Sequence, residues 1–162
     1  MASIPVSLTL NNIIRCIREG RFLESRLSTH PLYITEVKRK ISKTTKIIDL
    51  GCCFGTDIRY LVADGAEPSL ITGTDQFPEY IQLGFDLFGD KDKLTTRFIF
   101  EDFFSEQFAQ KALNNNTDDS SKYDIAYAGS VYHLFSLEQT EKFTQLVSSL
   151  LKSGKSLLVT TA

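Results

Sequence analysis

Short apolar runs alternate with amphipathic stretches along most of the chain. Five runs rich in β-branched or aromatic residues are bounded by polar or glycine-containing segments, which is the pattern of buried strands. These runs are 46–50, 70–75, 96–100, 123–128 and 156–161. Strands that alternate with helices are typical of an α/β domain, so we expect a parallel sheet of about five strands with helices on both faces.

Three segments between these strands carry apolar residues at helical spacing, and their ends show helix signals. The first helix stops at Gly65, and the second begins at Pro78, which suits the first turn of a helix. Ser136 and Gln139 form a capping-box pattern at the start of the third helix, and Gly154 closes it. These helices supply the covering layers that a parallel sheet requires.

The residues before the first strand predict a helical lead-in. Apolar residues repeat at helical spacing between residues 10 and 27, and we interpret the arginines among them, Arg26 included, as a solvated face. A second helix is expected over 32–41. It ends in a basic patch at 38–46, which suits the negative end of a helix dipole.

The chain has 162 residues, enough for one domain with its own core but not for two ordinary ones. We therefore predict a single domain over 1–162. It consists of a helical segment at 1–45 and a cofactor-binding α/β core at 46–162.

Composition narrows the expected partners and compartment. The net charge is −2 with no basic tail, which disfavours binding to nucleic acid. No run reaches the roughly 20 apolar residues that span a bilayer, so no membrane partner is expected, and residues 1–10 lack the features of a signal peptide. Three cysteines make no disulfide framework, so a reducing, cytoplasmic setting is predicted.

The first two predicted strands end in acidic residues, with a glycine turn after the first. Asp49 precedes the turn 51–55, and Asp75 ends the second strand twenty residues beyond Gly55. Glycines allow a sharp reversal and let a ligand approach the backbone, and the N–H groups at the start of the next helix then face that ligand. The position of Asp75 suits a carboxylate that accepts hydrogen bonds from a ribose diol.

The third and fourth predicted strands end in further candidate ligand groups. Asp102 and Phe103 follow the third strand, and a carboxylate beside an aromatic ring suits an adenine. Gly129 and Ser130 follow the fourth strand. Because the carboxyl ends of parallel strands meet at one edge of a sheet, we expect all four sets of residues to line one site.

The glycine pattern separates two kinds of cofactor. A dinucleotide site requires G-x-G-x-x-G, which would fall on Gly51, Cys53 and Thr56, so two of the three glycines are absent. Since a bulky pyrophosphate presses against the backbone, this pattern disfavours a nicotinamide-dependent oxidoreductase. A cofactor without pyrophosphate tolerates a small side chain at Cys53 more easily.

The motif D-x-G-x-C-x-G at 49–55 resembles the acidic-G-x-G-x-G motif of class I S-adenosylmethionine-dependent methyltransferases, with cysteine in place of the middle glycine. Further stretches are similar to fungal methyltransferases of meroterpenoid and polyketide biosynthesis. They are 49–59, 61–66, 73–75, 85–92 and 133–135. The resemblance implies a Rossmann-like fold and S-adenosyl-L-methionine as the cofactor.

The resemblance also implies a role for each predicted site residue. The turn 51–55 would wrap the methionine moiety, and Asp75 with Gln76 would bind the ribose. The residues after the third strand would bind the adenine, and those after the fourth would line the side of methyl transfer. The predicted cofactor-binding residues are Asp49, Gly51, Cys52, Cys53, Phe54, Gly55, Asp75, Gln76, Phe77, Glu101, Asp102, Phe103, Gly129 and Ser130.

We predict methyl transfer from this cofactor to an oxygen, either a carboxylate or a hydroxyl, of a small secondary metabolite; the resemblance alone implies the acceptor class. A hydroxyl acceptor needs a general base, and His133 is the candidate, with a structural role at a helix start as the alternative. No metal is expected, because no His, Cys, Asp and Glu cluster has ligand spacing. Cys52 and Cys53 are interpreted as small residues of a tight turn rather than a redox pair.

Class I methyltransferases usually have seven strands, of which the last two form an antiparallel hairpin beside the fifth. This sequence ends at Ala162, just after the fifth predicted strand. We therefore expect a C-terminally shortened homologue without the hairpin, in which 156–161 is an uncovered edge that suits pairing with a partner or a second copy. The alternative function is a catalytically inactive descendant that binds only the cofactor or a partner.

Overall fold

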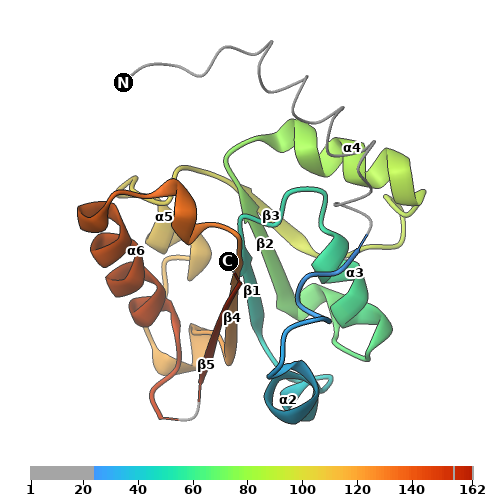
Figure 1. Cartoon of the computed structure of the whole chain (residues 1–162), viewed down its shortest axis with the longest axis horizontal. Helices are drawn as coiled ribbons and strands as arrows, with labels where there is room; N and C mark the ends of the chain where they lie inside the picture. The colour runs from blue at the N-terminus through green and yellow to red at the C-terminus, as the bar shows by residue number, and fades with distance from the viewer. Residues whose placement is uncertain (1–23, 155, 162) are drawn as a thin grey trace.

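A parallel sheet of five strands forms the centre of the protein (Figure 1). The structure is a computed structural model that describes residues 24–154 and 156–161. The strand order is β3-β2-β1-β4-β5. The strands are β1 Ile47–Leu50, β2 Ile71–Asp75, β3 Arg97–Phe100, β4 Ile125–Gly129 and β5 Leu157–Thr161. All five lie where the apolar runs predict them.

Helices cover both faces of the sheet, as the alternating pattern predicts. Helices α5 and α6 lie on one side, and α2, α3 and α4 lie on the other (Figure 1). The helices are α2 Lys38–Lys40, α3 Thr56–Ala63, α4 Pro78–Phe88, α5 Phe108–Ala112 and α6 Leu137–Leu150. A π-helical turn occurs at Tyr33–Val37, and 3-10 turns occur at Pro68–Leu70, Asp119–Ser121 and Tyr132–Leu134.

Successive residues of the central strand β1 face opposite helical layers. Ile47 belongs to the apolar cluster that contains Ile58 of α3, whereas Ile48 belongs to the cluster that contains Phe143 of α6. All four residues of β1 are buried, which explains why this strand is a continuous apolar run rather than an alternating one. Asp49 is the exception in that run, and it lies at the carboxyl end of the strand.

The lead-in to the sheet departs from the predicted helix over 32–41. A π-helical turn at Tyr33–Val37 runs directly into the short α2. Tyr33 is buried, whereas its neighbour Ile34 is 63% exposed. The hydroxyl of Tyr33 donates a hydrogen bond to Asp64 at 2.6 Å, so contact with the end of α3 decides which side chain faces the core. The helices expected before residue 24 lie outside the described residues.

Two helices differ in how well the sequence predicts them: the capping box of α6 is present, whereas α5 is not predicted. Ser136 accepts from the N–H of Gln139 at 3.3 Å, and the Gln139 side chain accepts from the N–H of Ser136 at 3.0 Å. The capping box of α6 is therefore confirmed. The sequence does not predict α5, because a helix of five residues is too short to show a helical period.

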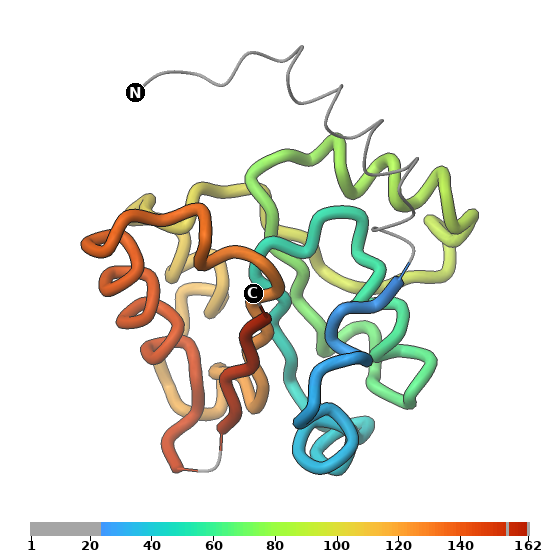
Figure 2. The backbone as a smooth tube through the Cα atoms, viewed as in Figure 1, coloured from blue at the N-terminus to red at the C-terminus, as the bar shows by residue number. Residues whose placement is uncertain are grey.

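Strand β1 lies between β2 and β4, so the order of the strands reverses there. Ile47 is in register with Ile71 on one side and with Ile125 on the other. Ligands of such sheets bind at the carboxyl ends of the strands beside this reversal. The lead-in segment 24–31 runs past the start of α3 near the same point (Figure 2). A ligand site is therefore expected at the carboxyl ends of β1 and β4.

Strands β3 and β5 form the two edges of the sheet. Every pairing among the described strands is parallel, so this part of the chain contains no antiparallel hairpin. Within the described ranges, no helix combines the length and the apolar character that crossing a membrane requires.

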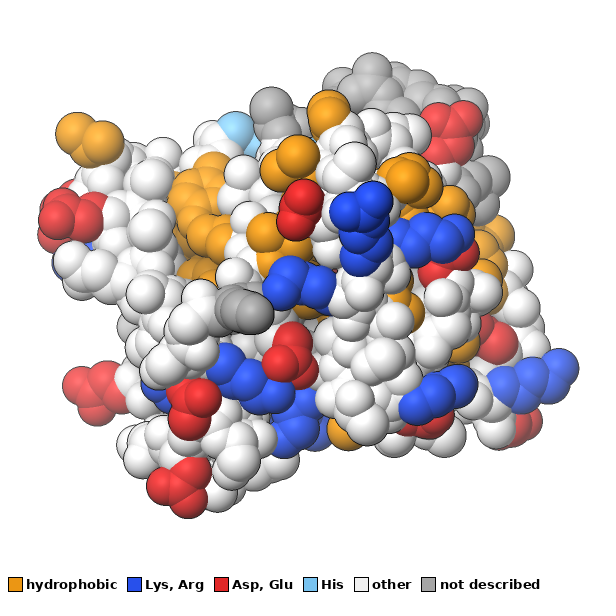
Figure 3. Space-filling model, turned by 90° about the horizontal axis from the view of Figure 1, so that it is seen from below, with side chains coloured by type: hydrophobic (Ala, Val, Ile, Leu, Met, Phe, Trp, Pro, Cys, Tyr) orange, Lys and Arg blue, Asp and Glu red, His pale blue; other side chains and the backbone are white. Residues whose placement is uncertain are grey.

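Charged side chains of both signs are mixed on the lower face of the molecule (Figure 3). In the basic segment 38–46, Lys38 pairs with Asp64 at 3.0 Å and Lys43 pairs with Glu67 at 3.6 Å. The two lysines are exposed and their acidic partners are half-buried, so water screens these pairs and they add little to stability. They show that local acids balance charge in the basic segment.

Candidate functional site

The turn after β1 contains three residues in the left-handed region of backbone space. Gly51, Cys53 and Gly55 have φ values of +79°, +50° and +72°. A Cβ at Gly51 would also lie 2.6 Å from Cγ2 of Val131, so both conformation and space require glycine there. Cys53 adopts a conformation that disfavours any residue with a Cβ. The backbone thus keeps the three-glycine geometry of the motif although the middle glycine is cysteine.

Hydrogen bonds tie this turn to the end of β2. The N–H of Gly51 donates to the carbonyl of Thr74 at 2.9 Å. The N–H groups of Cys53 and Phe77 donate to the two carboxylate oxygens of Asp75, each at 3.0 Å. Burial raises the pKa of Asp75 and outweighs the backbone hydrogen bonds from Phe77, Cys53 and Gln76, which lower it. Asp75 therefore anchors the turn as well as lying where a ribose acceptor is expected.

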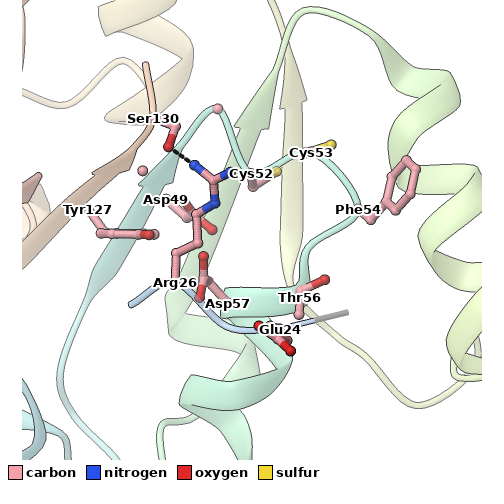
Figure 4. A pocket seen from close by; sticks show the side chains of 12 residues that line it. Glu24, Arg26, Asp49, Cys52, Cys53, Phe54, Thr56, Asp57, Tyr127 and Ser130 are labelled. Carbon is pink, nitrogen blue, oxygen red and sulfur yellow. Dashed lines mark hydrogen bonds between the residues drawn. The ribbon is translucent and has the colours of Figure 1, made fainter. Parts of the chain in front are cut away.

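A small cavity of about 170 Å³, which we call the polar cavity, lies at the carboxyl ends of β1 and β4 (Figure 4). Its wall is strongly charged, because three carboxylates and one guanidinium contribute to it. The lining residues are Glu24, Arg26, Asp49, Gly51, Cys52, Cys53, Phe54, Thr56, Asp57, Tyr127, Gly129 and Ser130.

Asp49 is a buried acid in the wall of the polar cavity. It is 2% exposed, and its Oδ2 atom has no hydrogen-bond partner within the described part of the chain. Burial, followed by the negative charges of Asp57 and Asp75, raises the pKa of the Asp49 carboxyl well above its ordinary value. Because an unpaired buried carboxylate is unfavourable, the cavity favours a cationic group beside Asp49.

A larger cavity, of about 530 Å³, adjoins the polar cavity. We call it the aromatic cavity, because phenylalanine and tyrosine rings form much of its wall. The lining residues are Gly51, Asp75, Gln76, Phe77, Tyr80, Glu101, Asp102, Phe103, Phe104, Gly129, Ser130, Val131, Leu134, Phe135 and Gln139. Gly51, Gly129 and Ser130 line both cavities, so the two form one cleft over the strand ends.

The residues after β3 are held in place by their own neighbours. Oδ1 of Asp102 accepts the N–H of Phe104 at 2.9 Å. The ring of Phe103 packs against Phe143 of α6 with ring centroids 5.0 Å apart. An aromatic ring fixed in this way offers a firm surface against which a planar base can pack.

The cleft contains nearly all of the residues that the sequence predicts for it. Of the predicted cofactor-binding residues, all but Gly55 line one of the two cavities. Gly55 instead caps the start of α3 in its left-handed conformation. His133 is exposed in the 3-10 turn Tyr132–Leu134 and lines neither cavity, although Val131 and Leu134 beside it line the aromatic one.

Comparison with known proteins identifies relatives of the chain. No protein-family model matches it. It is 34% identical over 145 residues to the O-methyltransferase atr3 of Stereocaulon alpinum, a match that covers 89% of this chain and 40% of that protein. It is 34% identical over 136 residues to the methyltransferase adrK of Penicillium roqueforti, covering 84% of this chain and 47% of that protein. The chain thus spans less than half the length of each relative.

Solved methyltransferases share the fold. The putative methyltransferase in complex with the Trm112 activator of Haloferax volcanii matches with a TM-score of 0.55 and 19% identity over 81% of this chain and 46% of that one. The magnesium protoporphyrin IX methyltransferase of Synechocystis PCC 6803, solved with bound SAM, matches with a TM-score of 0.50 and 19% identity over 67% of this chain and 46% of that one. Its similarity in sequence to atr3 and adrK makes the chain a homologue of methyltransferases.

The sequence of this methyltransferase homologue does not indicate that two residues, Arg26 and Tyr127, line the cleft. Arg26, interpreted as part of a solvated face, is exposed but lines the polar cavity and donates a hydrogen bond to Ser130. These two residues are 104 positions apart, so no local pattern connects them. Tyr127 has the sequence context of an ordinary core residue of a strand, but it lines the polar cavity. Its hydroxyl lies 2.4 Å from the position that a Cβ at Gly129 would take, so it fills the space beside that glycine.

The cysteines of the methyltransferase homologue's turn are free thiols. Burial, followed by the charge of Asp49, raises the pKa of the Cys52 thiol. A thiol that stays protonated is a poor nucleophile, which favours a structural role for Cys52 in the turn. Within residues 24–154 and 156–161, no group of three or more His, Cys, Asp and Glu side chains could hold a metal ion.

Proposed function

We propose that this domain binds S-adenosyl-L-methionine and supports methyl transfer to an oxygen atom of a small apolar metabolite. The observation that carries the proposal is the division of the cleft into a charged polar cavity and a larger aromatic cavity, joined at Gly51 and Gly129. The cofactor has the same division. It carries a zwitterionic amino acid at one end and an aromatic base at the other.

The polar cavity suits the amino-acid end of the cofactor. Asp49 presents a buried carboxylate oxygen without a described partner, and an ammonium group would relieve that unpaired charge. Gly51 lines the cavity and has no side chain of its own, so a ligand can approach the backbone there. Asp49 and the turn 51–55 would therefore hold the methionine moiety.

The aromatic cavity suits the adenosine end. The N–H groups of Cys53 and Phe77 donate to different oxygens of the Asp75 carboxylate, and the backbone of Gln76 donates as well, whereas a carboxylate offers about four acceptor positions. Asp75 therefore retains acceptor capacity for a ribose diol, with Gln76 beside it. Asp102 and Phe103 also line this cavity, where they would contact the base.

The remaining wall of the aromatic cavity suits an apolar acceptor. Val131, Leu134 and Phe135 form this wall next to Ser130, where the two cavities meet. The cofactor supplies an activated methyl group when it is bound, so the residues of the chain need only orient the acceptor and exclude water. The name of one relative, an O-methyltransferase, supports oxygen as the acceptor atom.

The position of His133 helps to decide whether the methyl acceptor is a carboxylate or a hydroxyl oxygen. Because His133 is exposed and lines neither cavity, it can act as a base only if the turn Tyr132–Leu134 changes conformation. A carboxylate acceptor is already ionised at neutral pH and needs no base. The geometry therefore favours a carboxylate over a hydroxyl.

Calorimetric titration with S-adenosylhomocysteine tests the proposal. We expect saturable binding and a rise in melting temperature, because a ligand that binds only the folded state stabilises it. NAD⁺ is the control ligand, and it should give neither effect. Absence of both heat and a thermal shift with S-adenosylhomocysteine would refute the proposed function. Binding without methyl transfer to any small carboxylic acid or phenol would instead favour a module that only holds the cofactor.

A further inference from the structure

The lead-in residue Arg26 is fixed on both sides by a single carboxylate. The hydroxyl of Ser25 donates to Oδ1 of Asp57 at 2.6 Å, and the N–H of Leu27 donates to the same oxygen at 3.0 Å. Asp57 lies in the first turn of α3, directly after the turn that lines the cleft. The backbone around Arg26 is therefore tied to the start of that helix.

Burial reinforces this attachment. Leu27 is fully buried in the apolar cluster that also contains Ile58 of α3, and Ser25 is only 8% exposed. The Arg26 side chain between them is directed into the polar cavity, and its guanidinium donates a hydrogen bond to Ser130 on the far wall (Figure 4). The neighbours of Arg26 are thus anchored in the body of the protein while its charge lies in the cleft.

The charges of the polar cavity match those of an α-amino acid. Glu24, Asp49 and Asp57 supply negative charge, and Arg26 supplies the guanidinium of the cavity wall. A carboxylate such as the buried Asp49 is a strong acceptor for an ammonium group. A carboxylate group is best bound by a guanidinium, which presents a fork of N–H donors.

We infer that Arg26 binds the carboxylate of the amino-acid moiety of the ligand and that Asp57 is a positioning residue that directs Arg26 into the polar cavity. This inference rests on the proposed function and assigns the carboxylate contact within it. On ligand binding, the guanidinium of Arg26 would donate to the ligand carboxylate in addition to, or in place of, Ser130.

Two ligands separate this role from a purely structural one. S-adenosylhomocysteine carries the amino-acid chain, whereas 5′-methylthioadenosine has the same adenosine and thioether without it. If Arg26 only cross-links the lead-in to β4, its removal disturbs the cleft for both ligands. If Arg26 binds the carboxylate, its removal affects S-adenosylhomocysteine alone.

The experiment measures the dissociation constants of both ligands for wild-type protein, Arg26→Met and Arg39→Met. Arg39 is an exposed arginine of α2 and serves as the matched control. We expect Arg26→Met to weaken S-adenosylhomocysteine binding by about 10- to 100-fold, as expected for loss of a charged hydrogen bond. Binding of 5′-methylthioadenosine should stay within about twofold of wild type, and Arg39→Met should change neither constant.

A double-variant cycle tests the role of Asp57. Asp57→Ala should weaken S-adenosylhomocysteine binding more in the wild-type background than in the Arg26→Met background, because beyond the loss of its own negative charge from the cavity it acts through Arg26. If Asp57→Ala fails to fold, Ser25→Ala removes one of the two tethers and takes its place.

Equal weakening of both ligands by Arg26→Met, or unchanged binding of S-adenosylhomocysteine, would overturn the assignment of Arg26. An undiminished effect of Asp57→Ala in the Arg26→Met background would overturn the positioning role. Failure of the wild-type protein to bind either ligand would refute the proposed function, and the inference with it. That result differs from the first two, in which the wild-type protein binds both ligands.

Discussion

The backbone N–H of Cys53 donates a hydrogen bond to the carboxylate of Asp75 at 3.0 Å. This contact joins the turn after β1 to the end of β2 and is made at the one turn residue that has a left-handed φ without being glycine. The carboxylate therefore stabilises a conformation that the sequence of the turn disfavours. Asp75, the expected ribose acceptor, therefore also contributes to the stability of the turn at Cys53.

Replacement of Asp75 by Ala should impair both properties. It removes the acceptor for the N–H groups of Cys53 and Phe77, which we expect to lower the free energy of unfolding by about 1–3 kcal/mol. It also removes the predicted ribose contact, so S-adenosylhomocysteine should bind at least about tenfold more weakly. Urea unfolding and calorimetry measure the two effects. The exposed Asp92→Ala is the control, and unchanged affinity in Asp75→Ala would mean that the ribose lies elsewhere.

Replacement of Asp49 by Asn should make stability less dependent on pH. Burial raises the pKa of Asp49 above its ordinary value of 3.8, so the folded protein binds that proton more tightly than the unfolded chain does. The resulting stabilisation is complete below the ordinary pKa and is lost as pH rises through the raised pKa of the folded state. Wild-type protein should therefore lose stability as pH rises from about 4 towards neutrality.

Asp49→Asn removes the buried negative charge, so it should raise the free energy of unfolding near neutral pH by about 1–3 kcal/mol while weakening ligand binding. Urea titrations at about pH 5 and about pH 8 give the slope with pH. Some slope should remain, because the pKa of Asp75 is raised as well. An unaltered slope in Asp49→Asn, judged against the exposed Asp92→Asn, would show that Asp49 is not the titrating group.

Replacement of Cys53 by Gly should relieve backbone strain. Cys53 has a φ of +50°, which costs a residue with a Cβ about 1 kcal/mol relative to glycine. Glycine loses more conformational entropy on folding than cysteine does, and this loss offsets part of the relief of strain. We therefore expect Cys53→Gly to raise the free energy of unfolding by only about 0.5–1 kcal/mol. Cys53→Ala is the matched control, because it removes the thiol but keeps the Cβ. Equal stability of the Gly and Ala variants in urea would argue against strain.

Replacement of Gly84 by Ala should be harmful although it lies within a helix. Glycine to alanine normally stabilises an exposed helix by about 1 kcal/mol. Here the new Cβ would lie 2.2 Å from the carbonyl oxygen of Phe54, in the turn that lines the cleft. We expect a loss of at least about 1 kcal/mol and weaker binding of S-adenosylhomocysteine, because either α4 or the turn must shift. Glu79→Ala, exposed on the same helix, should be near neutral; a gain in stability for Gly84→Ala would contradict the close contact.

The strands and much of the cleft could be predicted because their signals are local or follow from topology. Ile47 and Ile48 face different layers, so a strand buried on both faces is a continuous apolar run. Once the strands are parallel, Asp75 and Asp102 must come to the same edge of the sheet. Their positions at the ends of predicted strands are then enough to predict that they lie in one site, and both line the aromatic cavity.

The rest depends on contacts between distant segments. Arg26 reaches Ser130 across 104 positions, and nothing in the residues around Arg26 distinguishes it from a solvated arginine. The anchoring role of Asp75 likewise depends on the approach of Cys53 from another strand. Tyr33, rather than its apolar neighbours, faces the core because Asp64 accepts its hydroxyl. Each outcome is set by tertiary packing, which no local period encodes.

The central position of β1 has a consequence for how the chain folds. The N–H of Lys46, just before β1, donates to Asp124, just before β4, across 78 positions. Closing so long a loop costs entropy before any contact compensates for it, so pairing of β1 with β4 is expected to be slow. The polar cavity needs both strands and therefore forms only when the loop has closed. A ligand of this cavity would accordingly slow unfolding more than it would speed folding.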